Sequence, residues 1–169
     1  MPQEKPTTQL RCIVLGVGNT LWGDEGVGPK LVELLGQRFD IPDAELVDGG
    51  TQGLYLLPLV TDADKLLVFD AVKLGHTPGT VVVLKDDEID TIFRGALSLH
   101  QTTLHDLLGS ARLIGWKPQQ VVLIGIEAED TENWGGGLTS TVANATEEAL
   151  LHAEKTLRAW GLELTPNSP

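Results

Sequence analysis

The sequence predicts an α/β fold in which a mostly parallel sheet is covered by helices. Short β-branched apolar runs alternate with longer amphipathic stretches, which is the pattern of strands and helices in such folds. The run at 12–17 is apolar throughout and is typical of a central strand buried on both faces. The 169 residues, 41 % hydrophobic and 21 % charged, fit one domain over 1–169 with flexible polar tails at 1–9 and 165–169.

In the first half of the chain, a glycine-rich turn separates the strand at 12–17 from a helix. Val27, Leu31 and Leu35 recur at helical spacing, and Pro29 is compatible with a first helical turn. The elements predicted after the first strand are a helix at 26–38, a strand at 44–47, a short helix at 54–60 and a strand at 66–69 that ends at Asp70.

In the second half, the turn Thr77-Pro78-Gly79 leads into an apolar strand at 80–84. Only a short connection precedes this strand, so it could lie antiparallel at a sheet edge, although the sequence leaves its direction open. An acidic segment at 86–90 comes next. The remaining elements are predicted as a helix at 102–113, a strand at 120–126, a loop at 127–137 and a helix at 138–160, which brings the total to five strands and four or five helices.

The charge balance limits the classes of partner. Twelve Lys and Arg residues against 24 Asp and Glu residues give a formal net charge of −12, which repels nucleic-acid phosphates and anionic membranes. No apolar run approaches the ~20 residues that span a bilayer, and the first residues lack the pattern of a signal peptide. We therefore expect a cytoplasmic protein with no nucleic-acid partner and no membrane insertion.

Cysteine and serine chemistry is not indicated. Cys12 is the only cysteine, which excludes an internal disulfide and a zinc site built from several cysteines. It lies in the predicted first strand, where burial keeps a thiol unreactive. No serine lies in a G-x-S-x-G turn. Any metal site must therefore use His, Asp or Glu.

The glycine-rich turn at 16–28 follows a strand and precedes a helix, which suggests nucleotide binding. A dinucleotide site needs G-x-G-x-x-G, but Leu21 stands at the third glycine position, and the carboxylates of Asp24 and Glu25 would repel a pyrophosphate. No Gly-Lys-Ser/Thr follows to form a Walker loop. A nucleotide-binding regulator is thus the less favoured interpretation, and we expect Asp24 to cap the first helical turn.

Glu25 and Asp70 follow the first and third predicted strands. In an open parallel sheet, ligands gather beyond the carboxyl ends of the strands, so these two carboxylates could converge. His100, at the start of a helix, could approach the same edge, whereas His105 lies well inside that helix and cannot share its face as an i, i+4 pair would. Glu25, Asp70 and His100 would form a mixed oxygen and nitrogen ligand set suited to zinc or nickel.

The segment Asp48-Gly49-Gly50-Thr51 ends the second strand on the same edge, and its glycines would let the backbone approach a peptide substrate closely. The alternative is a tight turn in which Asp48 bonds its own backbone. Trp22 and Trp134 lie in predicted loops, where they could anchor a protein partner or fold back on the core.

The remaining polar candidates are expected at the surface. His76 lies in a loop, and His152 lies among charged residues of the last helix. The acidic runs at 86–88 and 127–132 could bind a cation weakly, but such runs are usually solvated.

Four blocks of sequence resemble the nickel-iron hydrogenase maturation proteases, the endopeptidases that trim the C-terminus of the hydrogenase large subunit. The blocks are Gly16-Val-Gly-Asn-Thr-Leu-Trp-Gly-Asp-Glu-Gly-Val-Gly28, Asp48-Gly-Gly-Thr-Gln-Gly53, Phe69-Asp70-Ala71 and Ser98-Leu99-His100-Gln101. The resemblance runs nearly end to end and is closest to the proteases that serve uptake hydrogenases. It implies a three-layer sandwich with a twisted five-stranded sheet.

The resemblance also implies roles for particular residues. The family's metal-binding and catalytic positions map onto Glu25, Asp70 and His100. The implied partner is the precursor of the hydrogenase large subunit, whose tail follows a Cys-x-x-Cys-x-x-His/Arg motif and is removed after nickel insertion. The nickel would be supplied by that substrate, with zinc or another divalent metal able to substitute in vitro, and the protease is expected to be a monomer.

Two mechanisms and two further classes of protein stay open at this stage. Nickel could polarise the scissile carbonyl and activate a water, with Asp or Glu as ligand or base, or the three residues could only dock on the substrate's nickel. A non-catalytic assembly factor or metallochaperone would bind nickel or the partner without cleaving it. A nucleotide-binding regulator would bind adenine nucleotides.

Overall fold

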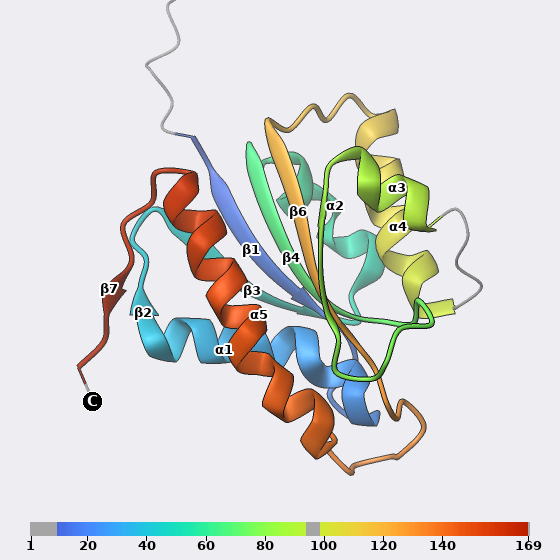
Figure 1. The fold of residues 1–169 in the computed structure, drawn as a ribbon. Coiled ribbons are helices and arrows are strands. Elements are labelled where there is room, and N and C mark those ends of the chain that lie inside the picture. Colours follow the sequence, from blue (N-terminus) through green and yellow to red (C-terminus); the bar gives the residue numbers. More distant parts are fainter. Residues whose placement is uncertain (1–9, 94–98, 169) are drawn as a thin grey trace, which may run out of the picture.

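The computed structural model describes residues 10–93 and 99–168, and of residues 93 and 99–103 it describes the backbone alone. Five strands form one twisted sheet in the order β3-β1-β4-β6-β5 (Figure 1). The strands are β1 (Cys12–Val17), β3 (Ala44–Gly50), β4 (Lys65–Val72), β5 (Val81–Lys85) and β6 (Gln120–Glu127). All neighbouring pairs are parallel except β5 with β6, so the predicted α/β class is confirmed, and the edge strand is antiparallel.

Helices cover both faces of this sheet and create two apolar layers. On one face lie α1 (Val27–Arg38) and α5 (Ser140–Ala159); on the other lie α2 (Leu57–Thr61), α3 (Asp87–Phe93) and α4 (Leu99–Leu113). Successive residues of β1 alternate between the two layers, as the pleat of a strand requires: Val14 packs under α1, and Ile13 and Leu15 pack on the opposite face. Within the described residues, no helix is long and apolar enough to cross a bilayer.

The structure adds elements that the sequence pattern does not predict. The acidic segment at 86–90 contributes to helix α3, and a short 3-10 helix, η1 (Gly23–Gly26), precedes α1. The short helix predicted at 54–60 is present as a 3-10 helix, η2 (Gly53–Leu56), that leads into α2. Arg112 of α4 donates a 2.6 Å hydrogen bond to Asp90 of α3, which pairs the acidic helix with its neighbour.

The expectation of a flexible tail at 165–169 is wrong for residues 165–167. Strand β7 (Thr165–Pro166) pairs antiparallel with β2 (Phe39–Asp40). The backbone N–H of Asn167 donates to the carbonyl of Arg38 at 2.9 Å, and its side-chain amide donates to carbonyls of the last turn of α1. These bonds satisfy helix carbonyls that would otherwise lack partners. The other predicted tail, residues 1–9, lies outside the described residues.

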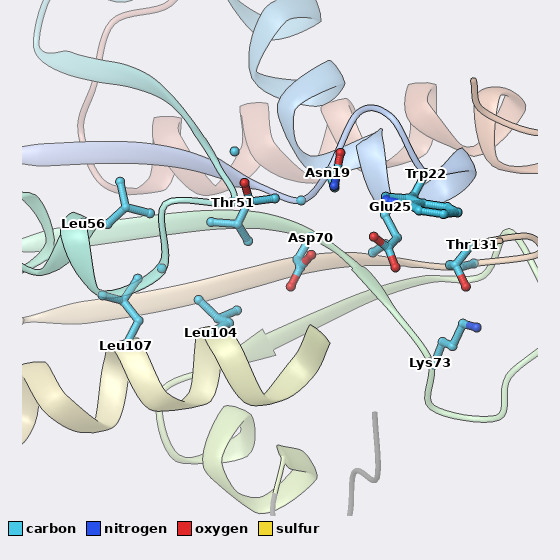
Figure 2. A pocket seen from close by; sticks show the side chains of 16 residues that line it. Asn19, Trp22, Glu25, Thr51, Leu56, Asp70, Lys73, Leu104, Leu107 and Thr131 are labelled. Atoms are coloured by element: carbon cyan, nitrogen blue, oxygen red, sulfur yellow. The ribbon is translucent and has the colours of Figure 1, made fainter. Parts of the chain in front are cut away.

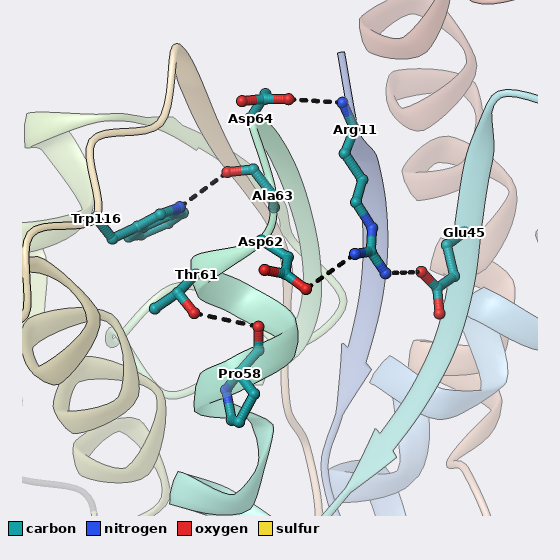
Figure 3. Close-up of polar contacts among 8 residues, drawn as sticks. All are labelled: Arg11, Glu45, Pro58, Thr61, Asp62, Ala63, Asp64 and Trp116. Carbon is teal, nitrogen blue, oxygen red and sulfur yellow. Dashed lines mark hydrogen bonds and ion pairs between the residues drawn. The ribbon is translucent and has the colours of Figure 1, made fainter. Parts of the chain in front are cut away.

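Polar contacts tie the strands together at the amino end of the sheet (Figure 3). The Arg11 guanidinium donates to Asp62 at 2.9 Å and to Glu45 at 2.8 Å, and its backbone N–H donates to Asp64 at 2.7 Å. The indole of Trp116 donates to the carbonyl of Ala63 at 2.9 Å. Exposed ion pairs such as those of Arg11 stabilise a protein weakly. These contacts lie at the end of the sheet opposite to the carboxyl ends of the parallel strands, where ligands bind in such folds.

Two glycines let α1 lie directly against the sheet. A Cβ at Gly28 would lie 2.2 Å from the carbonyl oxygen of Val17 and 2.6 Å from that of Phe69. A Cβ at Gly16 would lie 2.4 Å from the carbonyl oxygen of Gly28. Only glycine permits this approach, because backbone atoms of β1 and β4 cannot give way as a flexible side chain can.

We expect Gly28→Ala to lower the free energy of unfolding by about 3 kcal/mol, because the added methyl group overlaps the backbone of two central strands. Gly109→Ala is the matched control, since a Cβ there meets nothing within 4 Å. In the interior of α4 it should raise stability by about 0.5–1 kcal/mol. Urea unfolding measures both changes. If Gly28→Ala is as stable as the wild type, the close approach of α1 to β1 and β4 is contradicted.

Asp24 does not cap the first turn of its own helix, which corrects the prediction made from its position. Its carboxylate is fully buried in η1 and accepts hydrogen bonds from the backbone N–H groups of Glu129, Asp130 and Thr139 at 2.8–2.9 Å. The hydroxyl of Thr139, the N-cap residue of α5, also donates to it at 3.0 Å. One carboxylate therefore joins the loop after β1 to the loop after β6 and to the start of α5.

Asp24→Ala should lower the free energy of unfolding by about 3–5 kcal/mol, because it leaves three backbone N–H groups without their acceptor. Asp24→Asn retains one acceptor oxygen, so its free energy of unfolding should lie between those of Asp24→Ala and the wild type. Glu132→Ala, which removes an exposed carboxylate from the same loop, should change stability by less than about 0.5 kcal/mol. We call the Asp24 carboxylate and the N–H groups of Glu129, Asp130 and Thr139 the Asp24 hub. If Asp24→Ala is as stable as Glu132→Ala, the stabilising role of this hub is refuted.

Candidate active site

A cavity of about 270 Å³ lies where the central strands of the sheet end. Its walls come from the loop after β1, the segment from Gly50 to Leu56, the end of β4 and helix α4. Figure 2 shows the carboxyl groups of Glu25 and Asp70 pointing into this space beside Trp22, with Leu104 and Leu107 along the opposite wall. The predicted convergence of Glu25 and Asp70 is therefore present in the structure.

Asp70 is buried near the end of β4, where it pairs in register with Gly125 of β6. Burial raises the pKa of Asp70 well above its ordinary value. The backbone N–H of Ala71 opposes this shift by hydrogen bonding, while the negative charge of Glu25 raises the pKa of Asp70 further. The two carboxyl groups thus interact unfavourably where little water reaches them.

Glu25 reaches the cavity from η1, directly after the structural Asp24. Its backbone N–H donates to the carbonyl of Trp22 at 3.0 Å, and its side chain is only 7 % exposed. Adjacent residues of one helical turn point in different directions. This is why Asp24 faces the loops after β6 while Glu25 faces Asp70.

His100, the third predicted ligand, lies in the first turn of α4, but its side chain is outside the part that the structure describes. It precedes the cavity-lining Leu104 by four residues of that helix. Among the described side chains, no group of three His, Cys, Asp or Glu residues is placed to hold a metal ion. The ligand set that includes His100 therefore stays a prediction.

The predicted substrate segment divides into two parts. Gly50 and Thr51 line the cavity, and the carbonyl of Gly50 accepts the N–H of Gly18 at 2.9 Å. Gly49 packs inward, where a Cβ would lie 2.7 Å from Leu15. Asp48 accepts the N–H of Gly50 at 3.0 Å and lines a separate groove beside α1. Asp48 and Gly49 thus shape the turn, while the next two residues face the cavity.

Sequence reasoning missed several lining residues. Lys73 is the one basic side chain among the described residues that line the cavity, and Asn19 and Thr131 add polar groups. Lys73 follows Asp70 by three residues at the same strand end, so the rule that singled out Asp70 could have found it. The apolar wall of Leu104 and Leu107 carries no signal of its own, because its spacing is that of any buried helix face.

The other candidates have structural roles. Glu127 is buried and accepts the backbone N–H groups of Leu74 and Gly75 at 3.0 Å, and Asp130 accepts the N–H of Glu132 at 2.8 Å. Much of the acidic run at 127–132 therefore organises loops. Burial raises the pKa of the Cys12 thiol to about 11, partly offset by the charge of Lys65, which fits an unreactive thiol.

The remaining histidines lie away from the two carboxylates. His76 is exposed in the loop before β5, and His152 of α5 lies 3.7 Å from Glu148. His105 lies within α4, where its Nδ1 is 3.9 Å from a carboxylate oxygen of Asp106. Neither His76, His105 nor His152 is among the residues that line the cavity.

Comparison with known proteins identifies the family. The family model of hydrogenase maturation proteases, HycI, matches residues 29–156. The hydrogenase expression/formation protein HupD of Rhodobacter capsulatus is 46 % identical over 168 residues, which cover 98 % of this chain and 78 % of that protein. The hydrogenase 2 maturation protease of Escherichia coli K12 is 40 % identical over 159 residues, which cover 93 % of this chain and 96 % of that protein.

A solved structure agrees with these sequences. The hydrogenase maturating endopeptidase HybD of E. coli superimposes with a TM-score of 0.87 at 39 % identity, over 94 % of this chain and 98 % of that one. The chain belongs to the hydrogenase maturation proteases, a family of endopeptidases.

Proposed function

We propose that this protein removes the C-terminal extension from the precursor of a [NiFe] hydrogenase large subunit after nickel insertion. The observation that carries the proposal is the meeting of two buried carboxylates, Glu25 and Asp70, in an open cavity of a chain that belongs to the maturation proteases. Paired carboxylates in a partly desolvated cavity are a recurrent arrangement for hydrolysis and for binding a divalent cation.

The donor set fits nickel that the substrate carries. Glu25 and Asp70 supply oxygen donors, and His100 would supply a nitrogen donor from the helix that lines the cavity. Such a mixed set accepts borderline divalent metals, which is why zinc or another divalent ion could replace nickel in vitro. The repulsion between the buried carboxylates supports this proposal, because a cation between them would relieve it.

The residues of the cavity suit peptide hydrolysis. Nickel would supply Lewis-acid polarisation of the scissile carbonyl. Water attacks the carbonyl carbon, one carboxylate accepts a proton from it, and the C–N bond breaks as the leaving amine takes up that proton. Leu104 and Leu107 exclude solvent from the other side, which strengthens electrostatic interactions inside the cavity. In the rival mechanism, Glu25, Asp70 and His100 only dock on the nickel and thereby position the bond.

A second candidate is a nickel-binding assembly factor that holds the precursor without cleaving it. It would use the same carboxylates, so only the reaction product separates the two functions. The family favours the protease, since two similar E. coli proteins with solved structures are endopeptidases.

We expect a nickel-loaded large-subunit precursor to lose one discrete C-terminal peptide when it is incubated with this protein. Asp70→Asn and His100→Ala should slow the cleavage by at least about 100-fold, because each removes a group that acts at the reacting bond. His152→Ala, a histidine on the distant α5, is the matched control and should cleave normally. Intact mass spectrometry of the precursor measures the outcome.

The same assay can contradict the proposal at two points. A nickel-free precursor should stay intact, and its cleavage at the normal rate would refute the nickel-recognising role. Stable complex formation with an unchanged precursor mass would favour the assembly factor.

Asp70→Asn should also make the folded protein more stable at neutral pH. Because the pKa of Asp70 is raised in the folded state, the folded protein binds more protons than the unfolded chain above the ordinary pKa of about 3.9. The wild type therefore loses stability as the pH rises toward the raised pKa, whereas the Asn variant does not lose this contribution. The difference in unfolding free energy between the two proteins should be smallest near pH 4 and grow as the pH rises toward the raised pKa of Asp70.

Urea unfolding at several pH values measures this difference. Glu132→Gln, which removes an exposed carboxylate, should stay within about 0.5 kcal/mol of the wild type throughout. If Asp70→Asn proves less stable than the wild type at neutral pH, burial of the Asp70 carboxylate does not lower the stability of the folded protein.

A further inference from the structure

Large apolar side chains are exposed around the cavity more than elsewhere. In the part of the chain that the structure describes, nine large hydrophobic side chains are exposed, and five of them belong to the segments that border the cavity. All three exposed aromatic residues are among these five. The five residues are Leu21, Trp22, Leu54, Tyr55 and Trp134.

Trp22 and Trp134 form a pair at one side of the cavity. Their ring centroids lie 4.7 Å apart in an edge-to-face arrangement, and their backbones form an isolated antiparallel bridge. The N–H of Gly135 donates to the carbonyl of Leu21 at 2.8 Å, which extends this contact between the loops. Trp22 lines the cavity, while Trp134 is 61 % exposed beside it. The pair thus continues the cavity wall outward onto the surface.

Both tryptophans are held by the hub around Asp24. Its carboxylate fixes the N–H groups of Glu129 and Asp130, and its own N–H donates to the carbonyl of Asp130 at 2.8 Å. The loops that present Trp22 and Trp134 are therefore tied to each other by backbone bonds around a buried charge. Because the side chain of Trp134 is largely exposed, it adds little buried apolar area to the folded protein. An exposed aromatic side chain held in place by such contacts is typical of a surface that binds a partner.

Resting on the function proposed above, we propose that the Trp22–Trp134 pair, together with Leu21, docks the folded body of the precursor beside its cleavage segment. The contact would be made by aliphatic or proline side chains, which pack well on indole faces. A substrate chain that enters the cavity from a folded body must pass over the residues around the cavity mouth. Trp22 lines the cavity and contacts Trp134 outside it, so the Trp22–Trp134 pair is continuous with the proposed site of cleavage. Leu54 and Tyr55 are exposed in η2, whose Gly53 and Leu56 line another side of the cavity.

The test compares Trp134→Ala with the wild type in binding and in cleavage of the same nickel-loaded precursor. Trp134→Ala should raise the Kd and the KM about tenfold and leave kcat within twofold, because the side chain contacts the substrate away from the reacting bond. Trp134→Phe keeps an aromatic face and should restore most of the affinity. Ile114→Ala is the matched control, since Ile114 is equally exposed but follows the end of α4 that points away from the cavity.

The outcomes separate the docking surface from the proposed function. If the wild type binds and cleaves the precursor and Trp134→Ala leaves Kd and KM unchanged, the docking surface is refuted and the proposed function stands. If the wild type binds without cleaving, the protease function fails, and the Kd of Trp134→Ala still decides the docking. If the wild type does not bind the precursor, both fail. If sedimentation shows a dimer that Trp134→Ala dissociates, the surface serves a second copy of this chain, and the proposal is overturned.

Discussion

The buried carboxylate of Asp24 is the contact on which the rest of the site depends. It gathers three backbone N–H groups from Glu129, Asp130 and Thr139, so that the loops after β1 and β6 and the start of α5 share one anchor. A charge at this depth is stable because its hydrogen bonds replace the water it has lost. These bonds also fix the position of Glu25, because it directly follows Asp24 in η1. Of two neighbouring acidic residues, Asp24 thus holds the structure together and Glu25 faces the cavity.

The second constraint is the close approach of α1 to the sheet. Gly28 lies against carbonyl oxygens of both β1 and β4, which brings η1, at the start of α1, toward the end of β4. Glu25 and Asp70 meet as a consequence. Burial, and after it the negative charge of Glu25, raises the pKa of Asp70 and lowers the stability of the folded state. Glycine packing and the Asp24 hub therefore hold two acidic side chains close together in a buried place.

Local sequence patterns account for the sheet and for the edge that carries the site. The apolar runs predict the strands, and the strand ends single out Glu25 and Asp70, because parallel strands end at a common edge. The role of Asp24 was not predictable, since an acidic residue in a first helical turn looks the same whether it caps its own helix or binds amides more than 100 residues away. The pairing of β7 with β2 likewise depends on backbone bonds and on Asn167, which leave no periodic signal.

The size of the cavity limits what it can recognise. At about 270 Å³, it lies below the range of ~300–1,000 Å³ that encloses a drug-sized ligand. Under the proposed function it would hold the scissile bond and few neighbouring groups, which is too little to select one bond within a whole protein. Binding energy from parts of a substrate remote from the reaction can position the bond that is cleaved. An enzyme built in this way needs a rigid surface around a small cavity, and the backbone bonds around Asp24 provide that rigidity next to Glu25.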